Sequence, residues 1–150
     1  MGLDDDIAIL AAAPVFESFG QDALRLLTFA AERRVLRPGD VLFARGDPAD
    51  GGFVVMSGTI ALAPRVAGAA PVIAGPSALI GRLALFVRGA RPSDATAREP
   101  AAVMRITPAL MRRVLEEFPD AAAEIRAGLA EDLSGLSVGL ERVRAMLAPG

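Results

Sequence analysis

The chain has 150 residues and a formal net charge of −2, and it contains no His, Cys or Lys. Imidazole and thiolate are the usual ligands of zinc and other transition metals, so the composition excludes such a site. It equally excludes Ser-His-Asp and Cys-His catalytic groups, and we expect a protein that is not an enzyme and holds no metal. The length fits one domain over 1–150, and the charge balance does not favour a general affinity for nucleic acid.

Two helices are expected near the N-terminus. Residues 4–13 begin with an acidic turn, which suits the positive end of a helix dipole, and Pro14 interrupts them. Residues 21–32 place Leu24 and Leu27 on one face, as an amphipathic helix does. The acidic start lacks a basic leader region, and no apolar run approaches the ~18 residues of a membrane span. We therefore expect a cytoplasmic protein without a membrane contact.

The middle of the chain, from residue 35 to residue 106, has the sequence pattern of a β domain. Short apolar runs alternate with turn signals such as "RPGD", "RGDP", "DGG" and "SGT", a pattern that predicts a small antiparallel roll or sandwich. The expected strands are Val41–Ala44, Phe53–Met56, Ile60–Ala63, Pro71–Ala74 and Ala101–Ile106. Nearby, Arg33, Arg34 and Arg37 are interpreted as a solvated face next to acidic residues rather than as a docking patch.

The C-terminal part is expected to be helical again. Thr107 followed by Pro108 predicts a capped helix start, and Pro119 predicts the start of a long last helix. Apolar residues in this last helix follow a 4-3-4-3-4 spacing, typical of a coiled-coil seam. Its members are Leu129, Leu133, Leu136, Leu140, Val143 and Leu147. A homodimer through this seam is preferred, and packing of the helix on its own domain is the alternative.

The order of these parts resembles the cyclic nucleotide-binding domain of catabolite-activator-type regulators and of cyclic-nucleotide-gated kinases and channels. The stretches that carry the resemblance are "LRPGDVLFARGDPADGGFVVMSGTIAL" and "GPSALIG". The resemblance implies an α+β fold with an antiparallel β-roll of the double-stranded jelly-roll type. It also implies N-terminal helices over 1–34, the roll over 35–106 and C-terminal helices over 107–148.

The family's phosphate-binding cassette reads Gly-Glu-x-Ala-Leu, five further residues, then Arg-x-Ala-Thr. The ungapped match gives the candidate ligand residues Gly81, Arg82, Leu83, Ala84, Arg91, Pro92, Ser93 and Asp94. By resemblance, Gly81 and Ala84 allow the backbone to approach a phosphate and Arg91 holds its charge. A second alignment anchors on Ala95-Thr96 and puts Ser93 in the arginine's place, but it requires a two-residue insertion.

Three positions depart from the family pattern. Arg82 is a donor where the family has an acceptor for the ribose hydroxyl, and Pro92 has no backbone N–H. Asp94 brings a carboxylate to a place where the family has a hydroxyl, and a phosphate would be repelled there. We consider three hypotheses. Asp94 pairs with Arg82 or Arg91, or these are exposed loop charges, or Arg82, Arg88 and Arg91 hold a more highly charged anion.

The function expected from these features is a regulatory or interaction domain with an altered pocket, which does not bind cyclic AMP in the usual mode. The alternative is a cyclic nucleotide sensor with Arg91 as the phosphate ligand. No cofactor is expected apart from a possible cyclic nucleotide or other phosphate-bearing ligand. The last residues, "AMLAPG", leave no room for a helix-turn-helix, so we expect no direct DNA binding, and a protein partner is possible.

Overall fold

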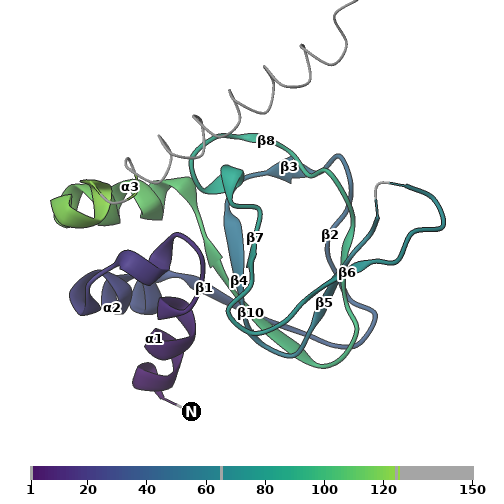
Figure 1. The fold of residues 1–150 in the computed structure, drawn as a ribbon, viewed down its shortest axis with the longest axis horizontal. Helices are drawn as coiled ribbons and strands as arrows, with labels where there is room; N and C mark the ends of the chain where they lie inside the picture. The colour runs from purple at the N-terminus through teal and green to yellow at the C-terminus, as the bar shows by residue number, and fades with distance from the viewer. Residues whose placement is uncertain (1, 65, 124, 126–150) are drawn as a thin grey trace, which may run out of the picture.

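The computed structural model describes residues 2–64, 66–123 and 125. Helices lie at one side of a β-roll, as Figure 1 shows. The N-terminal helices are α1 (Leu3–Ala11), the 3-10 helix η1 (Phe16–Ser18) and α2 (Gln21–Ala30). Both predicted N-terminal helices are confirmed, with shorter C-terminal ends than expected. Ala31 adopts an extended conformation after α2, and Glu32 begins a strand because it pairs with Arg105 across the sheet.

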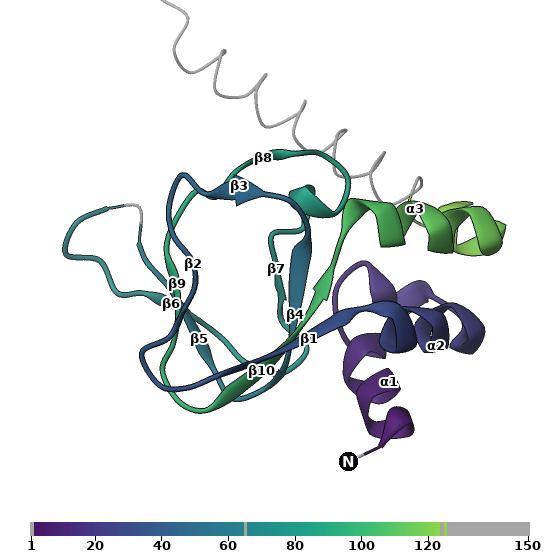
Figure 2. The same ribbon diagram turned by 180° about the vertical axis from the view of Figure 1, so that it is seen from behind.

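The strands form two four-stranded antiparallel sheets and one two-stranded pair. The first sheet has the order β1-β10-β4-β7, the second β2-β9-β5-β6, and the pair is β3-β8. Figure 2 shows the first sheet next to the helices and the second sheet on the far side of the roll. The strands are β1 (Glu32–Leu36), β2 (Val41–Phe43), β3 (Pro48–Ala49), β4 (Gly52–Ser57), β5 (Ile60–Leu62), β6 (Val72–Ala74), β7 (Leu79–Ile80), β8 (Gly89–Ala90), β9 (Ala95–Ala97) and β10 (Ala101–Ile106).

The predicted fold class, α+β with an antiparallel roll, is confirmed. The five expected runs correspond to β2, β4, β5, β6 and β10. Strands β1, β3, β7, β8 and β9 were not expected from the sequence. They have between two and five residues, and β1 is polar over its first three residues, so their strand character comes from pairing with distant segments.

The residues of β4 and β10 alternate between two cores. Val54 and Met104 face the helices, where they pack with the apolar faces of α1 and α2. Val55 and Val103 face the interior of the roll. This is the two-residue period of a strand, and both faces are apolar because both are covered. Each of the four side chains is almost fully buried, which contributes about 1.5–3 kcal/mol per residue.

The register of this sheet places charged residues on the roll face as well. Arg105 lies opposite Phe53 of β4 and Glu32 of β1, while Arg34 lies opposite Val103. Directly paired residues in antiparallel strands project from the same face. Arg34 and Arg105 therefore share the face of Val103 and Phe53, which form the core of the roll. Arg33 and Arg37 are exposed, and Arg34 pairs with Glu32 at 3.0 Å, in keeping with a face next to acidic residues. The Arg34 guanidinium also lies 5.6 Å from the centre of the Phe53 ring.

The chain leaves the roll directly into α3 (Pro108–Glu117). The Thr107 side chain accepts a hydrogen bond from the Leu110 backbone N–H at 3.1 Å, which confirms the predicted cap. Helical conformation resumes at Pro119, as expected. The predicted seam, Leu129, Leu133, Leu136, Leu140, Val143 and Leu147, lies outside the described residues.

Candidate functional site

The first half of the predicted cassette forms a tight turn and a short helix. β7 ends at Ile80, and Gly81 follows with a φ of +77°, a conformation that L side chains rarely adopt. The 3-10 helix η2 (Leu83–Leu85) comes next, and its Ala84 N–H donates to the Gly81 carbonyl at 3.0 Å. Ala84 is buried, whereas Arg82 is exposed. The glycine turn and the helix start that the sequence indicated are both present.

Arg91 is held in place by its backbone and points into the molecule. Its N–H donates to the Asp47 carbonyl at 2.8 Å, and its carbonyl accepts from the Gly46 N–H at 2.9 Å. These bonds extend the β3-β8 pair by one position. The side chain is only 5% exposed, although it carries a charge.

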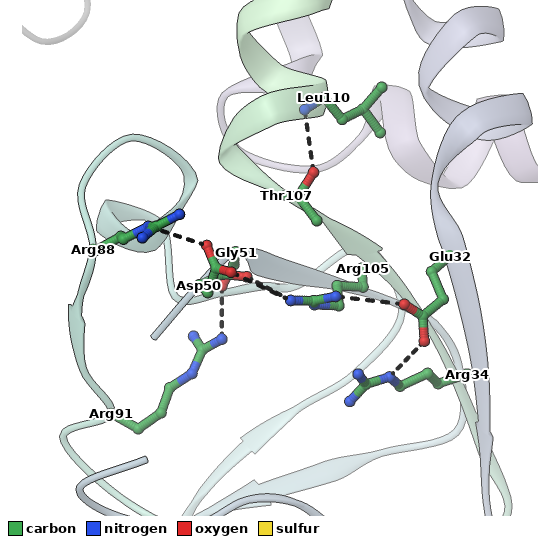
Figure 3. A network of polar contacts seen from close by, with 9 residues as sticks. All are labelled: Glu32, Arg34, Asp50, Gly51, Arg88, Arg91, Arg105, Thr107 and Leu110. Carbon is green, nitrogen blue, oxygen red and sulfur yellow. Dashed lines mark hydrogen bonds and ion pairs between the residues drawn. The ribbon is translucent and has the colours of Figure 1, made fainter. Parts of the chain in front are cut away.

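The Arg91 guanidinium is bound by the protein itself. Nη2 donates to the Gly51 carbonyl at 2.8 Å, a bond drawn in Figure 3. The group also lies over two aromatic rings, with Cζ 4.5 Å from the centre of Phe43 and 5.3 Å from that of Phe53. A Cβ at position 81 would lie 2.7 Å from Nη1, so Arg91 approaches this turn closely, while the φ of +77° is what favours glycine there.

One donor of Arg91 remains without an acceptor. Nε is buried, and no hydrogen-bond partner for it exists among the described residues. Burial lowers the pKa of Arg91, and the nearby charge of Arg105 lowers it further, while Asp50 opposes the change. The side chain is therefore a desolvated cation with spare hydrogen-bonding capacity.

The second half of the cassette lies on the other side of the chain from the Arg91 side chain. Pro92, Ser93 and Asp94 line an open cavity of about 520 Å³, together with Arg45, Ala63 and Pro64. The Asp94 carboxylate accepts a hydrogen bond from the Arg45 backbone N–H at 2.6 Å. The Asp94 carbonyl accepts from the Ala63 N–H at 3.0 Å, which connects the cassette to the end of β5.

This arrangement corrects one of the hypotheses for the charges. Asp94 does not pair with Arg91, because Arg91 turns inward to a carbonyl and Asp94 turns outward to a backbone N–H. The structure therefore brings Gly81, Ala84 and Arg91 together on one side, and Pro92, Ser93 and Asp94 on the other.

A second cavity, of about 330 Å³, lies beside the Arg91 side chain. It is lined by Arg34, Leu42, Phe43, Asp47, Pro48, Asp50, Phe53, Arg91 and Arg105. Several of these residues were not expected to take part in a site. One signal was available for Arg105, which is the only charged residue in the apolar run Ala101–Ile106. No corresponding signal marks Arg34, whose place depends on the register of β1.

Ion pairs connect this second cavity to the cassette. Asp50 lies 3.9 Å from both Arg88 Nε and Arg105 Nη2, and Arg105 also donates to the Asp50 carbonyl at 2.9 Å. Glu32 accepts from Arg34 Nε at 3.0 Å and from Arg105 Nη1 at 3.5 Å. Figure 3 shows this chain of contacts running from Arg88 across Arg105 to Arg34.

The described part of the chain contains no cluster of acidic residues that could hold a metal ion. In the same residues, no helix has both the length and the apolar character needed to span a bilayer.

Comparisons with known proteins agree with the fold. The cyclic nucleotide-binding domain family matches residues 33–118, which include the roll and α3. The structure of a cyclic nucleotide-binding-like protein from Brucella abortus is 41% identical, with a TM-score of 0.67. The match covers 75% of this chain and 99% of that one.

Two transcriptional regulators are also similar. The N-terminal domain of one from Streptomyces coelicolor is 26% identical with a TM-score of 0.79, over 88% of this chain and 94% of that one. A CRP-like cAMP-activated global transcriptional regulator of Mycobacterium tuberculosis is 27% identical over 128 residues. That match covers 83% of this chain but 57% of the regulator, so the chain corresponds to little more than half of that protein's length. The family match over most of the roll and the 41% identity together show that this chain belongs to the cyclic nucleotide-binding domain family.

Proposed function

We propose that this chain is a non-enzymatic regulatory or interaction domain whose ligand pocket has been altered, so that it does not bind cyclic AMP in the usual mode. The relatives in which its fold occurs include transcriptional regulators, one of them activated by cyclic AMP. Regulation through a domain of this fold is therefore the class of function that we assign. The alteration of the pocket is argued from the residues of the cassette.

The observation that carries the proposal is the place of Asp94. Its carboxylate lines the 520 Å³ cavity, where it is fixed by the 2.6 Å hydrogen bond from Arg45 N–H. An anion entering this cavity meets a negative charge, and Pro92 beside it offers no N–H. The cation that the family pattern provides, Arg91, is bound to Gly51 and does not line this cavity.

The exposed position of Arg82 supports the same conclusion. It stands at the start of η2, where the resemblance leads us to expect an acceptor for a sugar hydroxyl. A guanidinium can only donate hydrogen bonds. A ribose hydroxyl placed there would therefore lack the acceptor with which the family binds it.

The alternative function is a cyclic nucleotide sensor in which Arg91 binds the phosphate. One observation favours it, namely the buried Nε of Arg91 that lacks an acceptor. For this function the phosphate would have to reach the Arg91 guanidinium beside Gly81, where Nη2 is bound to the Gly51 carbonyl.

The cassette region and α3 share a cavity, which links either function to the C-terminal helices. Leu85, Phe86 and Arg88 of the cassette region line a shared cavity of about 280 Å³ with α3, through residues that include Met111. We propose that an occupant of the cassette acts by changing how α3 and the following helix pack on the roll.

Calorimetric titration of the full chain with cyclic AMP and cyclic GMP tests the proposal. We expect no binding tighter than millimolar for the wild type. The double variant Arg82→Glu with Asp94→Thr restores the acceptor and the hydroxyl, and we expect it to bind cyclic AMP measurably. The matched control is Arg25→Glu with Asp22→Thr, the same two changes on exposed positions of α2. Micromolar binding by the wild type, lost in Arg91→Gln, would instead establish the sensor.

We further propose a homodimer formed through the predicted seam of residues 129–147, with a protein partner as its possible target. Light scattering of the wild type and of Leu136→Asp tests the seam, with Ser137→Asp as the control outside the apolar spacing. We expect a dimer for the wild type and the control, and a monomer for Leu136→Asp. A wild type that is monomeric at high concentration contradicts the coiled-coil seam.

A further inference from the structure

No residue in the strands of the second sheet, β2-β9-β5-β6, carries a charge. An antiparallel sheet with one face in solvent usually alternates apolar residues inward with polar residues outward. The first sheet is apolar on both faces because the helices cover one face and the roll covers the other. The second sheet lies on the far side of the roll, so the helices of the described residues do not account for its apolar outer face (Figure 2).

One row of side chains crosses the outer face of this sheet. Val41 of β2 pairs with Thr96 of β9, and Thr96 also pairs with Ala61 of β5. Ala61 in turn pairs with Ile73 of β6. Directly paired residues project from the same face, so the four side chains lie side by side. Val41 is 60% exposed and Ile73 is 45% exposed, and the two apolar cores of the described residues include none of the four.

The 520 Å³ cavity adjoins this row. The hydrogen bond from the Ala63 N–H to the Asp94 carbonyl, at 3.0 Å, continues the pairing of β5 with β9 by one position. Ala63 and Asp94 are two residues away from Ala61 and Thr96, so they project from the same outer face. Both line the cavity. The row and the cavity therefore form one continuous surface, which we call the outer surface.

Asp94 provides a fixed negative charge at one end of the outer surface. Its exposed carboxylate accepts one hydrogen bond from the described residues, the 2.6 Å bond from the Arg45 N–H. An ionised carboxylate has about four acceptor positions, so Asp94 retains capacity for a donor from outside. Pro64 and Pro92 line the cavity beside it and offer apolar contacts to the stem of a long side chain. The cavity thus fits a basic side chain with its charged head at Asp94.

The extent of the row indicates the size of its partner. Four strands of three residues each present a face of about 200 Å², from a strand spacing of about 4.8 Å and a rise of about 3.4 Å per residue. A stable interface between two folded proteins buries about 800 Å² on each partner. The outer surface is therefore too small for a second folded copy and suits a short peptide segment.

We propose that the outer surface binds a short segment of a partner protein. Apolar residues of the segment lie on the row of Val41, Thr96, Ala61 and Ile73, and one of its Arg or Lys side chains enters the cavity at Asp94. An apolar surface without cover is the usual mark of such a contact. This inference rests on the proposed function, because it names the partner of an interaction domain.

The probe is a library of random dodecapeptides displayed on phage and selected on the full chain. Enriched peptides are synthesised and titrated by calorimetry and by NMR of the backbone amides. We expect apolar peptides that contain Arg or Lys and that shift the amides of Ala61, Ala63 and Thr96. Ala61→Lys places a charge in the middle of the apolar row and should abolish binding. Asp94→Asn removes the charge and keeps an acceptor, and it should weaken binding about tenfold.

Matched variants on the helices serve as controls. Ala109→Lys makes the same change at an exposed position of α3, and Asp22→Asn removes the same charge from α2. We expect both affinities to stay within about twofold of the wild type. If Ala61→Lys fails to fold, Ile73→Lys tests the same row from the edge strand β6. Absence of enriched peptides, or equal binding by the variants of the row and by Ala109→Lys, overturns the proposal.

Two further outcomes would assign the outer surface to another occupant and overturn the proposal. Weakening by Arg45→Gln but not by Asp94→Asn would indicate an acidic partner in the cavity. Self-association of Leu136→Asp that disappears when Ala61→Lys is added would indicate a second copy.

The cyclic AMP titration separates this inference from the proposed function. If the wild type binds cyclic AMP at micromolar concentration and the peptides still depend on Ala61 and Asp94, the altered pocket is refuted and the docking surface stands. If neither cyclic AMP nor any peptide binds, only the docking surface is refuted.

Discussion

The two cavities beside the cassette differ in how they hold their arginines. In the 520 Å³ cavity, Arg45 is exposed, and the fixed charge is the carboxylate of Asp94. In the 330 Å³ cavity, Arg91 is buried against the rings of Phe43 and Phe53 and bound to the Gly51 carbonyl. The chain passes from one to the other within the four residues 91–94. The cassette is continuous in sequence, but its side chains line two different cavities: Arg91 lines the smaller one, and Pro92, Ser93 and Asp94 line the larger one.

This difference shows that a residue can match a ligand position in a sequence motif without its side chain lining the cavity that the rest of the motif lines. Arg91 is at the position that the family pattern requires, yet its guanidinium lines a cavity formed by β1, β2, β4 and β10. The contrast can be tested by measuring the free energy of unfolding of variants. Replacing a buried arginine removes packing and hydrogen bonds, whereas replacing an exposed one removes little.

The largest loss of stability is expected for Gly51→Ala. The Gly51 carbonyl accepts the hydrogen bond from Arg91. Gly51 has a φ of +122°, and a Cβ there would lie 2.7 Å from the Ile106 carbonyl oxygen, which is backbone and cannot easily move. We expect a loss of about 3 kcal/mol in the free energy of unfolding, measured with urea. Gly39 has a φ of +90° in open space, so Gly39→Ala should cost only about 1 kcal/mol. Equal losses of stability in the two variants would show that the close approach of the Ile106 carbonyl oxygen to Gly51 adds nothing to the cost of the positive φ.

The second prediction compares the two arginines directly. Arg91→Ala removes the hydrogen bond to Gly51 and the packing on Phe43 and Phe53, and we expect a loss of about 2 kcal/mol. Arg91→Met keeps much of the packing and removes a desolvated charge, so its loss should be about 1 kcal/mol or less. Arg45→Ala should change the unfolding free energy by less than about 0.5 kcal/mol, because Arg45 is exposed. A loss in Arg45→Ala as large as in Arg91→Ala would contradict the contrast between the cavities.

The third prediction concerns the carboxylate of the larger cavity. Asp94→Ala removes the 2.6 Å hydrogen bond to Arg45 N–H and should cost about 1 kcal/mol in urea unfolding. Asp94→Asn keeps an acceptor and removes only the charge, so its stability should stay within about 0.5 kcal/mol of the wild type. If Asp94→Asn is as unstable as Asp94→Ala, the charge rather than the hydrogen bond holds this turn.

The smallest effect is a pH dependence at the rim of the smaller cavity. The hydrogen bond from Arg34 and its charge lower the pKa of Glu32, and Arg105 adds to the shift. A lowered pKa in the folded state means that the stabilisation is present above the pKa of the unfolded chain and is lost as pH falls through the folded pKa.

Glu32→Gln should therefore be less stable than the wild type by under about 1 kcal/mol at neutral pH, since Glu32 is exposed. Thermal unfolding between neutral and acidic pH should show this difference shrinking as Glu32 is protonated. The same change at Glu116, an exposed residue of α3, controls for the loss of one negative charge. A difference that is constant with pH would mean that Glu32 acts through packing alone.

Much of the fold could be predicted from local patterns. The turn dipeptides separated the longer strands, and Thr107-Pro108 marked the start of α3 because capping depends on neighbouring residues. The strands that were missed are short or polar, and β1 was interpreted partly as the end of α2 and partly as a solvated face. Its strand character arises from pairing with β10, some seventy residues away in sequence.

The candidate site was predictable in part. Gly81 and the helix start after it were identified, since a residue with positive φ before a short helix is a local feature. The partner of Arg91 was not, because a backbone carbonyl forty residues away leaves no mark in the sequence. One of the three hypotheses paired Asp94 with an arginine side chain, whereas its carboxylate accepts from the backbone N–H of Arg45.

The sequence by itself determined the order of helices and roll, the positions of the turns and the absence of the residues that metal or triad chemistry needs. These depend on composition and on neighbours in the chain. Only the tertiary structure decided which way Arg91 points and which residues surround it. The register between β1, β10 and β4 places Arg34, Arg105 and Phe53 on one face, and that register results from long-range pairing of strands that share a buried core.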